Sequence, residues 1–254
     1  MRVRELIPER ARARALRRAS VTLNRLGYEL HATSDTVLSA EEARRSRLLQ
    51  SREISLVLDV GANEGQYARQ LRGLGYRGRI VSFEPLSDAF SALERAAAED
   101  PLWECRRLAL GSEDGGAEIN VAGNSASSSL LEMKDRQLES APEARYVGTE
   151  RVDLARLDSI WPELRRDGDR VYLKLDVQGL ELEVLKGAEQ SLPAVSCVQA
   201  ELSFVPLYEG APDYLELIEH LRSRGFDLAG LEEGHDDRRT GEMLQADGIF
   251  VRND

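Results

Sequence analysis

A glycine-rich loop and carboxylates at the ends of apolar runs are the residues of this sequence whose types and spacing could do chemistry. The loop, residues 61–65 (GANEG), follows Asp59 at the end of an apolar run that begins at Leu56. Its glycines let the backbone approach a ligand closely, and the helix expected after it presents unpaired N–H groups. Glu84 ends the next apolar run, where an acid can accept hydrogen bonds from both ribose hydroxyls of a nucleoside.

The spacing within this loop narrows the kind of ligand. The dinucleotide fingerprint G-x-G-x-x-G is incomplete here, so no second glycine admits a pyrophosphate. A ligand with a ribose but no phosphate fits better. S-adenosylmethionine (SAM) is such a ligand, with its amino-acid end against the loop and its ribose against Glu84. The alternative interpretation is an ordinary strand–helix turn with an acid after the next strand.

An alternating α/β pattern must position these residues. The predicted strands are Leu56–Val60, Arg79–Glu84, Trp103–Leu110, Ala117–Val121, Val171–Leu175, Val195–Leu202, Phe226–Leu231 and Ala246–Val251. The last two strands have no helix between them, which predicts that the final one runs antiparallel in an otherwise parallel sheet. Ligands of open α/β sheets bind beyond the carboxyl ends of the strands. The residues expected at this edge are Asp59, Glu84, Gly111, Asp176 and Glu201.

The connections are also predicted from the pattern. Helices are expected after the glycine-rich loop, over Ser87–Ala98 and Leu154–Leu164, after Gly179, and over Pro212–Arg224. Residues 123–151, with a serine cluster, show no regular period. A loop this long in a compact domain is usually functional or disordered, so we interpret it as a substrate-side lid or as a surface loop.

Composition bounds the class of protein. The chain has 254 residues, 42% of them hydrophobic and 31% charged, which suits one soluble α/β domain. No apolar run approaches the roughly 20 residues that span a bilayer, and two cysteines without a metal or disulfide spacing predict a cytoplasmic protein. The net charge of −11 argues against a general nucleic-acid binder.

Residues 1–50 are expected to form a helical extension ahead of a domain over residues 51–254. They hold eleven arginines against six acidic residues, and helices are predicted over Ala11–Leu26 and Ser39–Gln50. Three interpretations stay open: the extension packs on the domain as part of a substrate lid, forms a homodimer interface, or lies weakly on an anionic membrane surface. The acids Glu5 and Glu9 weaken the last one.

Several blocks together resemble the FkbM-type SAM-dependent methyltransferases. In chain order over about residues 50–252 they are DVGANEGQYA, SFEP, LALG, LKLDVQGLELEVLKGAE, QAELSFVPLYEG and MLQADGIFV. The resemblance implies an α/β class I methyltransferase fold, Rossmann-like, with a mostly parallel seven-stranded sheet and an antiparallel last strand. It also implies methyl transfer from SAM to a hydroxyl oxygen of a sugar, in a glycan or glycolipid, or of a polyketide-type natural product.

Carried over by position, the resemblance implies a set of cofactor contacts. These are Asp59, Gly61, Asn63, Gly65, Glu84, Pro85, Leu110, Gly111 and Asp176. The loop residues would lie against the methionine end, Glu84 against the ribose, Leu110 and Gly111 beside the adenine, and Asp176 toward the reacting centre. Many members have Glu where this chain has Gln178, so a role that needs a carboxylate at this position is in question.

Methyl transfer to a hydroxyl requires alignment of the reactants and removal of the acceptor's proton. Asp176 and Glu201 could hold a Mg²⁺ that binds the acceptor oxygens, since hard cations prefer such ligands. Alternatively, Asp176 or His235 is the base. Each residue also has a purely structural interpretation: Asp176 caps a helix, Glu201 pairs with an arginine, and His235 is an exposed turn residue.

Two other functions compete with methyl transfer. A nicotinamide-dependent oxidoreductase is disfavoured by the incomplete fingerprint and the antiparallel closing strand. A non-catalytic module with the same fold is disfavoured by the intact loop and carboxylates. Methylation of protein or nucleic acid is disfavoured by the acidic body, so the expected acceptor is a small molecule.

Overall fold

The computed structural model describes residues 39–253. The predicted helix over Ala11–Leu26 lies outside the described residues, and the division of the chain at residue 50 stays a prediction. The second predicted helix is α2, Ala40–Ser51. Its start is capped reciprocally, because the Ser39 hydroxyl accepts from the Glu42 N–H and the Glu42 carboxylate accepts from the Ser39 N–H. Within the described range, no helix is both long and apolar enough to cross a membrane.

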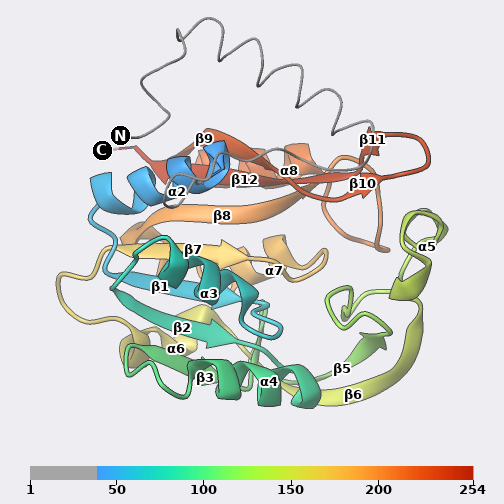
Figure 1. Cartoon of the computed structure of the whole chain (residues 1–254), viewed down its shortest axis with the longest axis horizontal. Coiled ribbons are helices and arrows are strands. Elements are labelled where there is room, and N and C mark those ends of the chain that lie inside the picture. The colour runs from blue at the N-terminus through green and yellow to red at the C-terminus, as the bar shows by residue number, and fades with distance from the viewer. Residues whose placement is uncertain (1–38, 254) are drawn as a thin grey trace, which may run out of the picture. The chain divides into compact units, whose positions relative to one another are not determined.

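Seven strands form the main sheet, in the order β3-β2-β1-β7-β8-β12-β9 (Figure 1). Their bounds are, in sheet order, β3 Trp103–Arg106, β2 Arg79–Phe83, β1 Leu56–Val60, β7 Val171–Leu175, β8 Val195–Ser203, β12 Gln245–Arg252 and β9 Phe226–Glu233. The pairs from β3 to β8 are parallel, whereas β12 pairs antiparallel with both β8 and β9. The antiparallel last strand is confirmed, and the sheet has the class I methyltransferase topology.

Helices cover both faces of this sheet, as the alternation of side chains along each strand requires. The bounds of these helices are α3 Gln66–Gly73, α4 Ser87–Ala97, α6 Leu157–Leu164, α7 Glu181–Lys186 and α8 Tyr214–Ser223. One face, with Val57 and Tyr172, packs against α2, α3 and α4. The other, with Leu58 and Leu173, packs against α6, α7 and α8. The central strands β1 and β7 are buried along their whole length.

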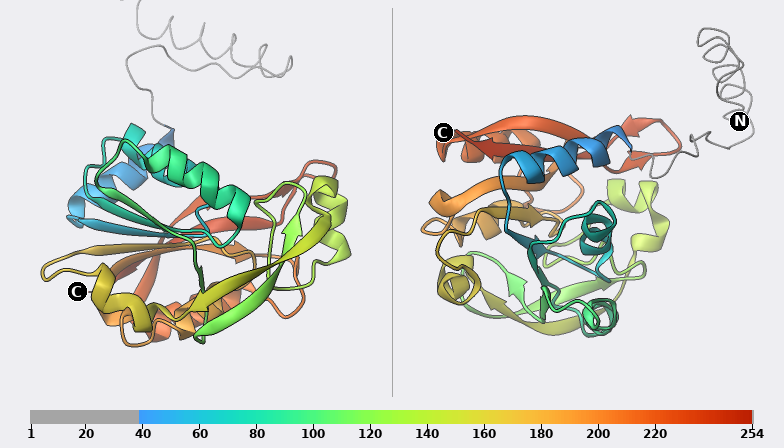
Figure 2. Two further views of the ribbon diagram at one scale, coloured as in Figure 1. Left: turned by 90° about the horizontal axis from the view of Figure 1, so that it is seen from below. Right: turned by 60° about the vertical axis from the view of Figure 1, so that its left-hand side comes forward.

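A second, three-stranded sheet is the main departure from prediction. It joins β4 (Ala109–Leu110), β6 (Tyr146–Ala155) and β5 (Gly115–Ala122) in that order, and Figure 2 shows β5 and β6 as a separate ribbon beside the main sheet. The predicted strand Trp103–Leu110 is therefore wrong: it is interrupted after Arg106, and its last two residues pair with β6 instead.

The predicted irregular segment 123–151 is also more ordered than expected. It contains a short helix, α5 (Asp135–Ser140), and the first half of β6. The predicted helix over Leu154–Leu164 begins only at Leu157. The first half of β6 is largely exposed, so its sequence lacks the alternation of apolar residues that marks a half-buried strand.

Candidate active site

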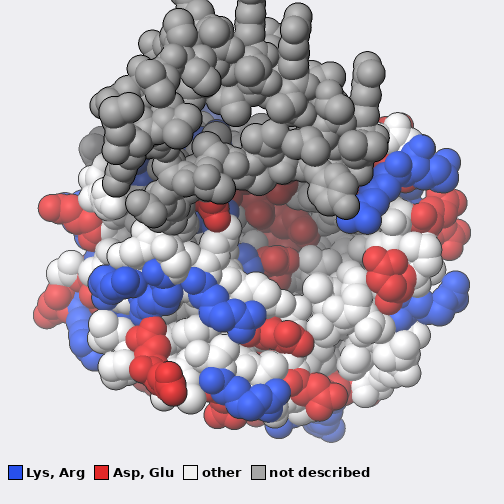
Figure 3. Space-filling model, in the orientation of Figure 1, with Lys and Arg blue, Asp and Glu red and all other residues white. Residues whose placement is uncertain are grey.

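A cavity of about 650 Å³ opens at the carboxyl ends of β1, β2 and β7. Its lining comes from the loops after these strands, from α2 and α3, and from the serine-containing segment 125–130. In the space-filling view a hollow is visible on this face, with acidic side chains in its depth (Figure 3). The carboxylates that line the cavity are Glu84, Asp176 and Asp247, and its cationic groups among the described residues are Arg45 and Lys174.

Glu84 is fixed by the backbone of two loops. Its Oε2 accepts from the Asn63 N–H at 2.8 Å and its Oε1 from the Leu86 N–H at 2.9 Å. Burial raises the pKa of this carboxyl to about 7, although the two backbone hydrogen bonds oppose the rise. Each oxygen keeps acceptor capacity toward the cavity, which suits a ligand with neighbouring hydroxyls.

At Gly61, the backbone after β1 packs tightly against the backbone after β7, at Asp176. The φ of Gly61 is +78°, and a Cβ at this position would lie 1.8 Å from the carbonyl oxygen of Asp176. Only glycine allows this contact. The sequence therefore places glycine here for backbone packing as well as for access by a ligand.

Three non-glycine residues with positive φ meet at the cavity: Asn63 (46°), Ser125 (52°) and Gln178 (53°). The Ser125 hydroxyl donates to Asn63 Oδ1 at 3.2 Å, and the Ser129 hydroxyl donates to the Gln178 carbonyl at 2.8 Å. Such conformations are sparsely populated and cluster at functional sites. The serine segment thus joins the loop after β1 to the loop after β7 and forms part of the cavity wall.

Six of the nine predicted cofactor contacts line the cavity: Gly61, Asn63, Glu84, Pro85, Leu110 and Asp176. The other three are Asp59, Gly65 and Gly111, which do not. Gly65 lies against the Trp103 ring and Leu93 and allows α3 to begin there, while the Gly111 carbonyl packs against Gly187. The packing around residue 65 thus accounts for Gly65, whereas the contact between Gly111 and Gly187 accounts for the glycine at position 187; a contact of Gly65 or Gly111 with the cofactor stays a prediction.

Asp59 lies beneath the cavity and is completely buried. Its Oδ2 accepts from the Ser82 hydroxyl, and its Oδ1 has no hydrogen-bond partner but lies 3.6 Å from Lys174 Nζ. Burial raises the pKa of Asp59, and Lys174 opposes the rise. Lys174 also donates to Asp176 Oδ2 at 3.1 Å. The lysine therefore links the buried acid to the one that faces the cavity.

Lys174 stays charged in this position. Burial alone would lower its pKa, but the carboxylates of Asp176 and Asp59 raise it above its usual value. The Lys174 ammonium is therefore a charged hydrogen-bond donor to Asp176. This lysine was not among the residues singled out in the sequence.

Gln178 connects the two acids that were predicted as metal ligands. Its Nε2 donates to Asp176 Oδ1 at 2.9 Å and to Glu201 Oε2 at 3.3 Å, while its Oε1 accepts from the Tyr208 hydroxyl at 2.6 Å. An amide donor thus occupies the position between the carboxylates where a bridging cation would lie. Over residues 39–253, no group of three or more His, Cys, Asp or Glu side chains is arranged to hold a metal.

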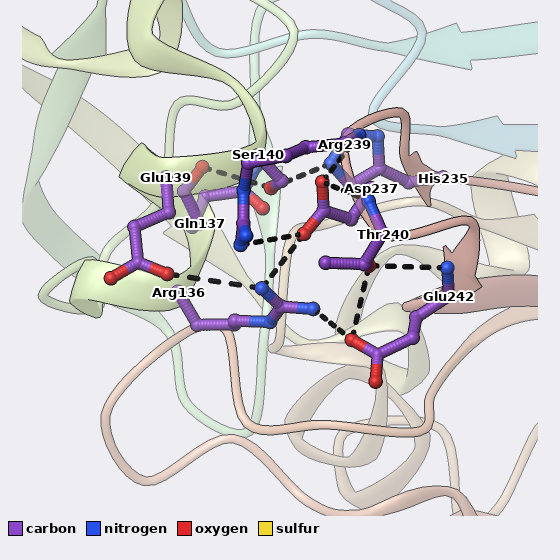
Figure 4. A network of polar contacts seen from close by, with 9 residues as sticks. All are labelled: Arg136, Gln137, Glu139, Ser140, His235, Asp237, Arg239, Thr240 and Glu242. Carbon is purple, nitrogen blue, oxygen red and sulfur yellow. Dashed lines mark hydrogen bonds and ion pairs between the residues drawn. The ribbon is translucent and has the colours of Figure 1, made fainter.

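The remaining predicted catalytic residues lie outside the cavity lining. Burial and the neighbouring carboxylates raise the pKa of Glu201, which accepts a hydrogen bond from the Gln178 amide. His235 Nε2 lies 2.9 Å from the Ser140 hydroxyl, within a polar network that joins α5 to the hairpin of β10 (Asp236–Asp237) and β11 (Glu242–Met243) (Figure 4). Arg136 on α5 and buried Asp237 form the central ion pair of this network, at 2.8 Å. The geometry gives His235 a structural contact.

Sequence reasoning missed a set of polar residues at the other end of the cavity. These are Arg45, Tyr67, Gln70, Gln199 and Asp247. Arg45 forms a buried ion pair with Glu232, and the Tyr67 and Tyr172 hydroxyls both donate to Gln199 Oε1 at 2.8 Å. A polar residue inside an apolar strand, as in Val195–Ser203, was the available signal for Gln199. Arg45 carried none, because it is one of many arginines in its segment.

Comparisons with known proteins identify the family of the domain that carries this cavity. The sequence model described as the methyltransferase FkbM domain matches residues 59–228. Methyltransferase sdnD of Sordaria araneosa is 31% identical over 157 residues, which cover 53% of this chain and 60% of that protein. 2-O-methyltransferase NoeI of Sinorhizobium fredii (strain NBRC 101917 / NGR234) is 26% identical over 164 residues, covering 61% and 66%. The chain thus spans less than two thirds of the length of either relative.

Among solved structures, Aeropyrum pernix fibrillarin with natively bound S-adenosyl-L-methionine is 12% identical, with a TM-score of 0.45 over 82% of this chain and 74% of that one. The matched range 59–228 is more than half of the chain and includes both blocks that the resemblance rested on, the loop after β1 and the segment after β7. SAM, predicted from the loop and Glu84, is the cofactor of this domain. The chain belongs to the methyltransferase FkbM domain family.

Proposed function

We propose that this chain is a SAM-dependent O-methyltransferase that acts on a hydroxyl of a sugar, in a glycan or glycolipid, or of a polyketide-type natural product. The observation that carries the proposal is the shared cavity of Glu84 and Asp176, two carboxylates held at the ends of separate strands. The relative NoeI, whose name gives it as a 2-O-methyltransferase, supports transfer to oxygen.

The residues of the cavity suit the parts of the cofactor. Glu84 keeps free acceptor capacity for the two ribose hydroxyls, and Leu108, Leu110 and Ile119 supply apolar surface for the adenine. Gly61 and Asn63 line the cavity where the methionine end is expected. When bound, SAM supplies an electrophilic methyl group. The chain's own groups must then orient the acceptor, exclude water and take up one proton.

Asp176 is the carboxylate proposed to face the reacting centre. Lys174 and Gln178 each donate to one of its oxygens, so its side chain is held in one orientation. Asp176→Asn should lower turnover by roughly a hundredfold while the affinity for S-adenosylhomocysteine (SAH) changes little. Unchanged turnover would remove Asp176 from the mechanism.

Calorimetric titration of the full chain with SAH, with and without Mg²⁺, is the first test of the function. Binding in the micromolar range should be followed by detection of SAH formation from SAM with glycosides and hydroxylated polyketides as acceptors. An absence of SAH binding under both conditions would overturn the proposal. Binding of NADH, seen by fluorescence, would favour an oxidoreductase instead, and SAH binding without turnover on any hydroxyl would favour a non-catalytic module.

The Mg²⁺ hypothesis is tested separately. Because the Gln178 amide lies between Asp176 and Glu201, we expect turnover to survive exhaustive chelation. Loss of turnover on chelation, with recovery on addition of Mg²⁺, would show instead that Gln178 moves aside and the two acids bind the cation.

A further inference from the structure

The five residues at the far end of the cavity form a continuous polar surface, called here the polar lobe: Arg45, Tyr67, Gln70, Gln199 and Asp247. They come from α2, α3, β8 and β12. The predicted cofactor contacts include none of them. The role assigned to this lobe rests on the proposed O-methyltransferase function and deepens it.

The strand order separates the lobe from the cofactor. Glu84 directly follows β2 and Asp247 lies in β12, with β1, β7 and β8 between them. At about 4.8 Å per strand, the two carboxylates belong to strands roughly 19 Å apart. The predicted cofactor contacts that line the cavity belong to β4 or follow β1, β2 and β7. The lobe over β8 and β12 is left for the second reactant.

The lobe is rigid because its polar groups are tied to one another. The Tyr67 and Tyr172 hydroxyls both donate to Gln199 Oε1, so the amide N–H₂ of Gln199 is turned the other way and donates to the Asp247 carboxylate. On the neighbouring strand β9, Glu232 lies opposite Asp247 and pairs with Arg45. Arg45 also donates to Gln70 Oε1 at 2.6 Å, and its Nε has no partner among the described residues.

Asp247 has the most unused acceptor capacity of the cavity's carboxylates. Glu84 accepts from two backbone N–H groups, and Asp176 accepts from Lys174 and Gln178. For Asp247 the only hydrogen-bond donor found within the described range is the Gln199 amide. Burial raises the pKa of Asp247 to about 6, and the Asp176 carboxylate adds to the rise, so the group is ionised yet moderately basic at neutral pH.

We propose that the polar lobe binds the acceptor, that this acceptor is polyhydroxylated, and that Asp247 is the catalytic residue that takes the proton of the reacting hydroxyl. The acceptor oxygen forms its bond to the methyl carbon as its proton passes to Asp247. The carbon–sulfur bond of the cofactor breaks with its electron pair left on sulfur, and Asp247 then releases the proton to solvent. Arg45 supplies a donor for an adjacent acceptor oxygen. A wall of amides, a guanidinium and a carboxylate matches neighbouring hydroxyls better than an apolar polyketide surface.

The test uses the full chain, SAM, and three probe acceptors: methyl α-L-fucopyranoside, methyl α-D-mannopyranoside and methyl β-D-galactopyranoside, with benzyl alcohol as an apolar alcohol. SAH formation and SAH affinity are measured for the native chain, for Asp247→Asn, and for the matched control Asp227→Asn, an exposed acid on β9. We expect turnover on at least one glycoside, a fall in kcat of roughly a hundredfold or more in Asp247→Asn alone, and SAH affinity within about twofold in all three proteins.

The pH profile separates catalysis from a structural role. Asp247 must be ionised to act, so kcat should fall as the pH drops through about 6, and this acid limb should be absent from the residual activity of Asp247→Asn. The charged groups around Asp247 are Lys174 on β7, Asp176 directly after β7, Glu201 on β8, Glu232 on β9 and its partner Arg45 on α2. Arg45→Lys retains a cation for Glu232 and should raise the KM for the glycoside with little change in SAH affinity. The control Arg47→Lys, at an exposed position, should change neither quantity.

Each other outcome overturns the inference. Retained kcat in Asp247→Asn places the base elsewhere, and turnover on benzyl alcohol but on no glycoside contradicts the acceptor class while leaving O-methylation intact. SAH binding without turnover on any probe also rejects the assignment. A native chain that does not bind SAH fails the proposed function itself, which is a different result from all of these.

Discussion

The two ends of the cavity are built in opposite ways. At the Glu84 end, the loop after β1 and the loop after β2 hold one carboxylate through backbone N–H groups that are 21 and 2 positions away from it. In the polar lobe, side chains hold side chains: Arg45 and its partner Glu232 are 187 positions apart. The difference teaches that a cofactor end made from backbone can be read from short motifs. An end made from distant side chains exists only after the sheet has formed.

Gly61→Ala should have the largest effect on the cavity, because Gly61 packs the loop after β1 against the backbone of Asp176. A Cβ would overlap the Asp176 carbonyl, and the φ of +78° is unfavourable for alanine. We expect a loss of about 4 kcal/mol in the free energy of unfolding together with loss of SAH binding, measured by denaturant unfolding and calorimetry. Gly73→Ala is the control, since nothing lies within 4 Å of its added Cβ. Equal stability of the two variants would contradict the close approach.

Lys174→Met tests the buried charged pair of Lys174 and Asp59 beneath the cavity. Without the ammonium, the Asp59 carboxylate is buried with Ser82 as its only hydrogen-bond donor among residues 39–253, so we expect about 3 kcal/mol of destabilisation by chemical denaturation. Asp59→Asn combined with Lys174→Met removes both charges and should recover most of this loss. A double variant as unstable as the single one would show that the pair is not coupled.

The pH dependence of SAH binding sharpens the account of the Glu84 end. Its pKa of about 7 is raised from the usual value by burial, and only the ionised form accepts from both ribose hydroxyls. Affinity should therefore be full above pH 7 and fall as the pH drops through 7, to roughly tenfold weaker at pH 6. Calorimetry from pH 6 to 8.5 measures this, with Glu84→Gln as a weaker binder whose affinity is independent of pH in this range. A flat profile for the native chain would assign the ribose to another group.

His235→Ala should have the smallest effect, because His235 belongs to neither end. It loses one contact with the Ser140 hydroxyl, at about 1 kcal/mol of stability, and kcat should change by less than about threefold. Thermal unfolding measures the stability, and initial rates with an acceptor that the native chain methylates measure kcat. A tenfold loss of kcat would restore the histidine as a candidate base.

Local pattern predicted most of the main sheet. The strands β1, β2, β7, β8, β9 and β12 were expected nearly at their observed bounds because their apolar runs are short, buried and ended by turns. The second sheet was missed, because β4 has two residues and the first half of β6 is exposed. Neither stretch carries the period of a half-buried strand.

The residues of the candidate site also divide into those that local sequence pattern predicted and those that it missed. Glu84, Gly61 and Asn63 were found because a glycine-rich loop after an apolar run, and an acid after the next apolar run, can be recognised in a short stretch of sequence. Asp59 and Gly65 belong to the same motif yet do not line the cavity: Asp59 is buried beneath it beside Lys174, and Gly65 packs against Trp103. A motif gives the residue types but not the direction of each side chain.

The sequence by itself determined the strand–loop–helix unit, the acid after the next strand and the antiparallel closing strand, since each depends on neighbours along the chain. Only the tertiary structure decided that Gln199 and Asp247 line the same cavity as Glu84, and that Arg45 joins them. The physical reason is sheet order. β8 and β12 become neighbours only when the last strand is inserted between β8 and β9, and no local period along the chain encodes that insertion.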